Sequence, residues 1–144
     1  MCIRYNGIAL SQSLIRNYIY FLMTKTQRII RWVLLTLVTL GFGAAGTAKL
    51  LGVPMEVAGF AHWGYPLWFM YFTGAAEVLG AIGIHVKKCS RYAALGLAIV
   101  AVGAIATHVS HGEGLIAPIP ATILLLSLFG ILSIGRNEAS AKIF

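Results

Sequence analysis

The chain has 144 residues, of which 59% are hydrophobic and 10% are charged, and its mean hydropathy is +0.85. Soluble domains average about 45–50% apolar and about 25% charged residues, so this composition excludes an ordinary water-soluble protein. The net charge of +7 does not indicate nucleic acid as a partner, because the basic residues flank apolar segments and form no stripe. We therefore expect one domain whose main partner is the lipid bilayer.

The first 26 residues are interpreted as a separate N-terminal segment. Residues 14–22 are rich in aromatic side chains but too few to cross a bilayer. They are expected to form either a short interfacial helix or a poorly ordered leader. The residues from Met23 onward would themselves make a normal start for a membrane protein, so Met1 and Met23 both remain candidates for the true start.

Four long apolar segments follow, at about residues 32–51, 66–86, 92–109 and 115–135. Each approaches or reaches the ~20 residues that a helix needs to span ~30 Å of hydrocarbon. The segments lack the alternation of a strand, and small residues recur at the spacing that lets membrane helices pack closely. The pattern predicts an all-α membrane protein with four transmembrane helices in an antiparallel bundle, forming a domain at residues 27–136 with a tail at 137–144.

The positions of lysine and arginine predict the orientation of this bundle. Basic residues precede the first segment, fill the second connection and follow the fourth segment: Arg28, Arg31, Lys87, Lys88, Arg91, Arg136 and Lys142. The connections at residues 52–65 and 110–114 contain none. The positive-inside rule then places both termini in the cytoplasm. Cys2 and Cys89 show no metal-binding spacing, and no structural disulfide is expected in the reducing cytosol.

The outer connection at residues 52–65 is the one long loop. Pro54 is expected to open a helical turn that ends at Gly59. Together with the start of the next segment the loop is rich in tryptophan, tyrosine and phenylalanine. It is interpreted either as an aromatic belt at the membrane surface or as a lid over an outward-facing pocket.

Two charged residues occur inside predicted spans. Lys49 lies near the outer end of the first span and Glu77 near the middle of the second, where a bare charge costs at least ~2.5–3.5 kcal/mol. Helical side chains tilt toward the N-terminus, so these two lean toward each other in antiparallel helices and meet directly or through water or a third residue. Glu77, with Thr73 on its face, is interpreted either as a protonatable or ligand-contacting group, or as half of a pair that sets helix register.

His108 ends the third span, with His111 one turn later and Glu113 just beyond. Two histidines and a carboxylate can bind a divalent metal, but without an HExxH motif the pattern is too weak to predict a metal site. The pair is interpreted either as interfacial histidines that cap the helix end, or as a proton carrier in which His108 joins Lys49 and Glu77.

Several short motifs occur in the order typical of one family: Gly46-Thr-Ala-Lys49-Leu, Glu77-Val-Leu-Gly80-Ala-Ile-Gly83, the run from Ala93 to His108, and Pro118. Over roughly residues 27–136 the chain resembles the DoxX-like family of small bacterial integral membrane proteins. The resemblance implies a four-helix protein of the bacterial cytoplasmic (inner) membrane. It also implies a redox association, because founding members of the family are small subunits linked to a membrane quinone oxidoreductase.

Three functions follow as hypotheses. In the first, the chain is an accessory subunit that docks on a membrane oxidoreductase and holds a quinone-like molecule. Glu77 is then its polar anchor, Lys49 the charge partner and His108 a proton carrier. The chain has no heme-ligand pair, cysteine redox pair or nucleotide-cofactor motif, so it is not expected to be an oxidoreductase on its own.

In the second hypothesis the chain is a proton-coupled small transporter that uses Glu77 and works as a homo-oligomer, although the neighbouring Lys49 would already neutralise this carboxylate. In the third it is a structural bundle with no ligand. His111, Glu113 and Thr73 are weaker candidates for site residues in any of these.

Overall fold

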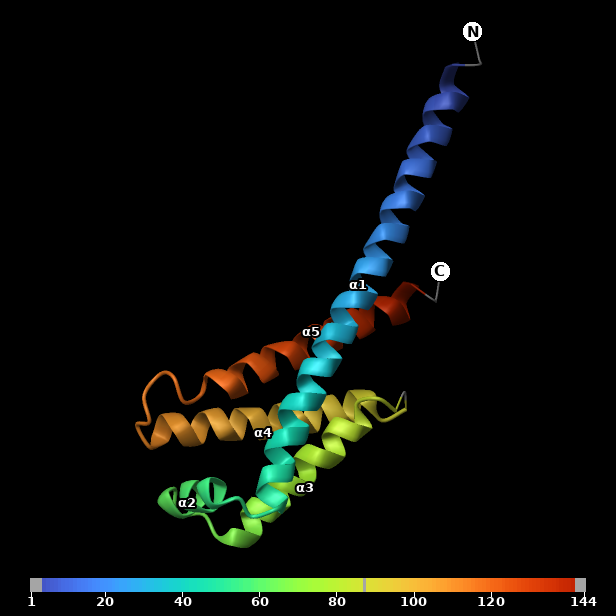
Figure 1. Cartoon of the computed structure of the whole chain (residues 1–144). Coiled ribbons are helices and arrows are strands. Elements are labelled where there is room, and N and C mark those ends of the chain that lie inside the picture. The colour runs from blue at the N-terminus through green and yellow to red at the C-terminus, as the bar shows by residue number, and fades with distance from the viewer. Residues whose placement is uncertain (1–3, 87, 142–144) are drawn as a thin grey trace. The chain divides into compact units, whose positions relative to one another are not determined.

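The computed structural model describes residues 4–86 and 88–141, and it describes side chains for residues 25–86 and 88–134. All regular elements in these ranges are helices (Figure 1): α1 (Arg4–Leu50), α2 (Pro54–His62), α3 (Leu67–Gly83), α4 (Ser90–Ser110) and α5 (Ile119–Ala141). The prediction of an all-α fold is therefore confirmed. The chain divides into two compact units, Met1–Val33 and Leu34–Phe144, and the hydrophobic core belongs to the second unit.

Four helices correspond to the four predicted apolar segments, and the differences lie at their ends. Residues 14–22 belong to the single long helix α1 and not to a separate short helix. Helix α5 begins at Ile119, later than the predicted residue 115. An earlier start would require a hydrogen bond from the backbone N–H that Pro120 lacks, whereas proline is accepted in a first turn.

The connection between α1 and α3 contains the short helix α2. Pro54 stands in its first turn, as predicted. The helix does not end at Gly59, however, but continues to His62, and the residue with positive φ is Gly64 at 72°. The Gly64 N–H donates to Ala61 O and the Tyr65 N–H donates to Phe60 O. These two bonds satisfy the last carbonyls of the helix, a termination that depends on a glycine just past the helix end.

The core lies between α1, α3, α4 and α5. Its buried side chains are Leu35, Val38, Phe42, Ala81, Ile84, Ala94, Leu97, Ala101, Leu128 and Ile131. Helix α4 packs against both α3 and α5, and α2 packs against α3 (Figure 1). The second half of α1 contacts α5, because a β-carbon on Gly41 would meet the side chain of Leu124. The four longer helices thus enclose one apolar interior.

Among the described residues, two helices are long and apolar enough to cross a membrane, judged by length and composition alone: Lys25–Leu50 within α1, and α4. Helix α3 and residues Ile119–Ile134 of α5 are shorter apolar helices.

Candidate functional site

The predicted site residues of the first two spans lie at a close crossing of α1 and α3. A β-carbon on Gly46 would lie 2.7 Å from the backbone oxygen of Gly74, and one on Gly74 would lie 2.9 Å from the backbone oxygen of Gly46. Lys49 and Glu77 each follow their glycine by one helical turn. The β-carbon of Lys49 therefore faces Gly74, and that of Glu77 faces Gly46. Small residues at this point let the two backbones approach and bring both charged side chains to the crossing.

Lys49 and Glu77 form a direct ion pair across this crossing. The Lys49 Nζ donates to Glu77 Oε2 at 3.0 Å, and only 12% and 7% of the two side chains are exposed. The sequence was compatible with direct contact or with a bridge through water or a third residue, and the structure has direct contact. The pair is enclosed by protein, which is the arrangement expected for opposite charges held away from water and lipid.

Glu56, in the first turn of α2, is a third member of this group. Its Oε2 lies 3.7 Å from Lys49 Nζ, and 28% of its side chain is exposed. Lys49, Glu56 and Glu77 are called the Lys49 cluster below. One ammonium group faces two carboxylates here, so the cluster has an excess of one negative charge when both carboxylates are ionised.

Glu56 was not among the site residues predicted from the sequence. The sequence nevertheless contained a feature that could have identified Glu56, because the chain has only four acidic residues. In so apolar a chain each carboxylate beside a helix needs a partner, since an unpaired buried charge is costly. The sequence could not show that the loop folds back as a helix that brings Glu56 to Lys49.

A second polar group surrounds Glu113 in the connection between α4 and α5. Trp63 Nε1 donates to Glu113 Oε1, and His108 Nδ1 donates to Glu113 Oε2. The edge of the Trp63 ring meets the His108 ring, with their centroids 5.2 Å apart. Trp63, His108 and Glu113 are called the Glu113 cluster. The hydrogen bond from His108, followed by the bond from Trp63, lowers the pKa of the Glu113 carboxyl below its ordinary value.

The backbone around Glu113 turns sharply to allow these contacts. Gly112 and Gly114 flank it with φ values of 65° and 79°, which favour glycine. The structure thus places His108 with Glu113 and Trp63. Within the part of the chain whose side chains are described, His108 makes no hydrogen bond with Lys49 or Glu77.

Two weaker candidates have local structural roles. His111 Nδ1 donates to Thr107 O at 2.9 Å, so this histidine caps the end of α4, as one interpretation of the sequence had it. The Thr73 hydroxyl bonds to Met70 O and Phe69 O of its own helix. Among the described side chains, no group of three or more histidine, cysteine or acidic residues is arranged to hold a metal ion.

Helix α2 connects the two clusters. Its first turn supplies Glu56 to Lys49, and the residue that caps its end, Trp63, contacts Glu113. Between them Phe60 is buried, and its ring lies 5.5 Å from that of Trp63 and 6.3 Å from that of Phe69. The outer connection is therefore a packed helix with a polar contact at each end.

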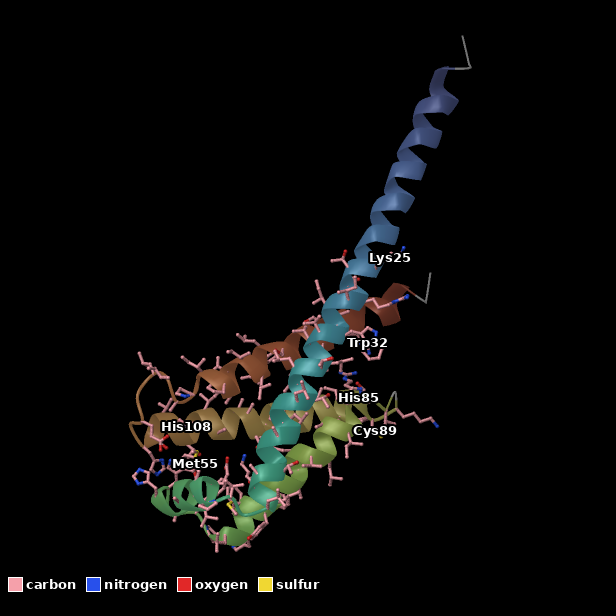
Figure 2. The ribbon with its side chains drawn as sticks, viewed as in Figure 1. Lys25, Trp32, Met55, His85, Cys89 and His108 are labelled. Carbon is pink, nitrogen blue, oxygen red and sulfur yellow. The ribbon has the colours of Figure 1, made fainter. Side chains whose placement is uncertain are left out.

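A further histidine contact lies at the other end of the bundle. His85 Nε2 and Thr39 Oγ1 are 2.7 Å apart, which joins α1 to the residues after α3. Figure 2 shows His85 and Cys89 at this end and Met55 and His108 at the opposite end. This contact was not predicted from the sequence, because nothing in the spacing of two polar residues 46 positions apart indicates that they meet.

Comparisons with known proteins give one family. The model of the DoxX-like family matches residues 33–130, which confirms the resemblance seen in the sequence. A Bacillus subtilis (strain 168) protein named Uncharacterized protein YdgD is 36% identical over 88 residues, which cover 58% of this chain and 77% of the relative. No solved structure matches the chain significantly.

Proposed function

The chain belongs to the DoxX-like family, and we propose on this basis that it is a four-span protein of the bacterial inner membrane with both termini in the cytoplasm. We further propose that it acts as an accessory subunit of a membrane redox system. In this role the Lys49 cluster holds a small apolar molecule with a carbonyl oxygen, of the quinone kind.

The outward faces of the helices support the membrane part of the proposal. Each of the four longer helices exposes large apolar side chains: Leu40 (67%) on α1, Leu79 (69%) on α3, Ile99 (74%) on α4 and Leu126 (65%) on α5. A monomeric water-soluble protein rarely exposes apolar surface on this scale. Helix α3 has 17 residues, or about 26 Å, so it crosses the ~30 Å hydrocarbon layer only with its flanking residues.

The single observation that supports the ligand part is the unequal sharing of Lys49 between two carboxylates. Its ammonium group lies 3.0 Å from the buried Glu77 but 3.7 Å from the partly exposed Glu56. A carbonyl oxygen is a hydrogen-bond acceptor and can replace the weaker partner while the strong ion pair stays intact. Reduction of a quinone consumes protons, and groups that bind protons then lie beside the carbonyl.

The tight helix crossing supports a second candidate, a structural bundle in which the Lys49–Glu77 pair fixes the register of α1 and α3. A charge pair at a position where the backbones touch permits no sliding of one helix past the other, because a slip would leave both charges unpaired. The transporter hypothesis has less support, because a cationic substrate would have to displace Lys49 from Glu77.

Binding of decyl-ubiquinone to the full chain in quinone-free nanodiscs distinguishes these candidates. We expect saturable binding by the wild type. Lys49→Met should weaken it about tenfold or more, since a hydrogen bond to a charged group contributes about 1.5–3 kcal/mol. Glu56→Gln should leave binding intact or tighten it, because the variant removes the charge that competes for Lys49.

Lys88→Met is the matched control, because Lys88 lies in the connection between α3 and α4, away from the cluster. If Lys49→Met lowers stability but binds decyl-ubiquinone as the wild type does, the structural candidate replaces the ligand proposal. If the wild type does not bind decyl-ubiquinone, the structural candidate likewise replaces the ligand proposal.

A further inference from the structure

The two outer connections use their carboxylates for contacts within the protein. These connections are residues 51–66, which join α1 to α3 and include α2, and residues 111–118, which join α4 to α5. Each contains one acidic residue and no lysine or arginine. Glu56 meets Lys49 at 3.7 Å, and Glu113 accepts hydrogen bonds from Trp63 and His108. The charged side chains that water would solvate best are therefore bound to other parts of the chain.

The exposed side chains of the outer connections are apolar. At residues 51–66 the exposed residues are apolar or glycine, with His62 as the exception, and at residues 112–118 all of them are apolar or glycine. The most exposed large side chains of these connections are Leu51 (76%), Met55 (83%), Leu115 (91%) and Ile116 (81%). A loop in water has the reverse arrangement, with polar groups outside and large apolar groups buried.

The inner connection of the same chain, between α3 and α4, has the arrangement of a loop in water. His85, Lys88 and Cys89 are exposed there beside Val86, and the exposed Arg91 follows in the first turn of α4. Figure 2 shows His85 and Cys89 at this end of the bundle and Met55 at the opposite end. One end thus presents charge, whereas the other presents aliphatic side chains. This difference indicates different surroundings at the two ends.

The backbone of the longer outer connection has little need of water as a partner. N–H groups on both sides of α2 donate to nearby carbonyl oxygens of the chain: those of Leu51, Gly52, Val53, Trp63, Gly64 and Tyr65. Backbone that lies against lipid must satisfy its hydrogen bonds internally, because hydrocarbon offers no partner. The turns before and after α2 meet this condition.

We propose that α2 and the connection between α4 and α5 lie in the outer leaflet of the bilayer, with Met55 and Leu115 among the lipid chains. A short helix with an apolar outer face buries that face where headgroups and acyl chains meet. His62 and His111, whose ring centroids are 6.4 Å apart, lie at headgroup level, because histidine combines an apolar body with a polar tip.

This inference rests on the proposed four-span arrangement and deepens the ligand proposal. Helix α2 borders the Lys49 cluster through Glu56. When α2 lies in lipid, a molecule that displaces Glu56 from Lys49 reaches it from the bilayer. The ligands of the cluster are then restricted to molecules that dissolve in lipid.

Collisions of spin labels with two relaxing agents locate these side chains. Labels are attached singly at Met55→Cys and Leu115→Cys, in the full chain with Cys2 and Cys89 replaced by serine, in nanodiscs of phosphatidylethanolamine and phosphatidylglycerol. Oxygen concentrates in lipid, whereas a water-soluble nickel complex stays in water. Because the two native side chains are 83% and 91% exposed, the protein itself does not shield these positions. We expect frequent collisions with oxygen, and collisions with nickel about tenfold rarer than at Cys89, since a polar solute is excluded from an apolar layer.

Two reference positions calibrate the measurement. The native Cys89, labelled in a chain that carries only Cys2→Ser, represents water, because it is exposed in the inner connection. Ile99→Cys represents the lipid interior, because Ile99 is 74% exposed near the middle of α4. Leu51→Cys and Ile116→Cys repeat the measurement in each outer connection, so the test does not depend on the folding of a single variant.

Nickel collisions at Met55→Cys and Leu115→Cys as frequent as those at Cys89 would overturn the inference. Rare collisions with both agents would also overturn it, because another protein chain would then cover these positions. If Ile99→Cys meets nickel as often as Cys89 does, the four-span proposal itself fails. If Ile99→Cys behaves as in lipid while the outer positions behave as in water, only this inference fails. The measurement contains no quinone, so its outcome is independent of decyl-ubiquinone binding.

Discussion

The substitution Gly46→Ala tests whether the close crossing of α1 and α3 is what holds the Lys49–Glu77 pair together. The new methyl group would lie 2.7 Å from the backbone oxygen of Gly74 and 2.9 Å from the β-carbon of Glu77. Neither atom can rotate away, so the helices must separate. Overpacking of this kind costs about 1–3 kcal/mol, and the rigid contact places this site at the upper end of that range.

A favourable term partly offsets this cost. Alanine is about 1 kcal/mol better than glycine inside a helix, so we expect a net loss of about 2 kcal/mol in the free energy of unfolding. Gly43→Ala is the matched control, one turn earlier in the same helix, where a β-carbon would meet nothing within 4 Å. Gly43→Ala should show only the favourable effect of the higher helix propensity of alanine, a gain of up to about 1 kcal/mol in the free energy of unfolding.

Reversible unfolding in mixed micelles with increasing dodecyl sulfate, followed by tryptophan fluorescence, measures both variants. The expected result is a change of opposite sign for the same substitution at two positions on one helix. A Gly46→Ala protein as stable as Gly43→Ala would refute the reasoning, because the crossing would then tolerate a methyl group and could not be what forces the ion pair together.

Three further predictions concern the two clusters. Lys49→Met should lower the free energy of unfolding by about 3–5 kcal/mol, because it leaves two facing carboxylates without a cation. Glu77→Gln should lower it by less, and equal losses in the two variants would contradict this reasoning. Trp63→Phe should speed amide hydrogen exchange in α2, because the donor to Glu113 is lost, whereas Trp68→Phe should not, since Trp68 is 67% exposed. The lowered pKa of Glu113 means that its contacts stabilise the fold above the ordinary carboxyl value of 4.5 and cease to do so as the pH falls through the lowered pKa. Thermal melts from about pH 7 to about pH 3 should show this acid loss in the wild type and not in Glu113→Gln.

The main features of the fold could be predicted because they depend on local composition. Long apolar runs without alternation can only be helices in a chain with so little polar surface, and Pro54 marks the start of α2 wherever the rest of the chain lies. The Lys49–Glu77 contact could also be predicted from local features of the sequence. Two opposite charges on small-residue faces of antiparallel helices have few other partners, and their side chains tilt toward each other.

The sequence by itself therefore determined the helical class, the family and the residues most in need of partners. Only the tertiary structure decided which partners they have. Glu56 meets Lys49, and Trp63 meets Glu113, because α2 packs against α3, and this depends on long-range packing of Phe60 and on turns at Gly52 and Gly64. One interpretation of the sequence joined His108 to Lys49 and Glu77 as a proton carrier, but the turn between Gly112 and Gly114 supplies a nearer carboxylate. Contacts between residues about 50 positions apart follow from the geometry of the folded chain, which helical periodicity does not encode.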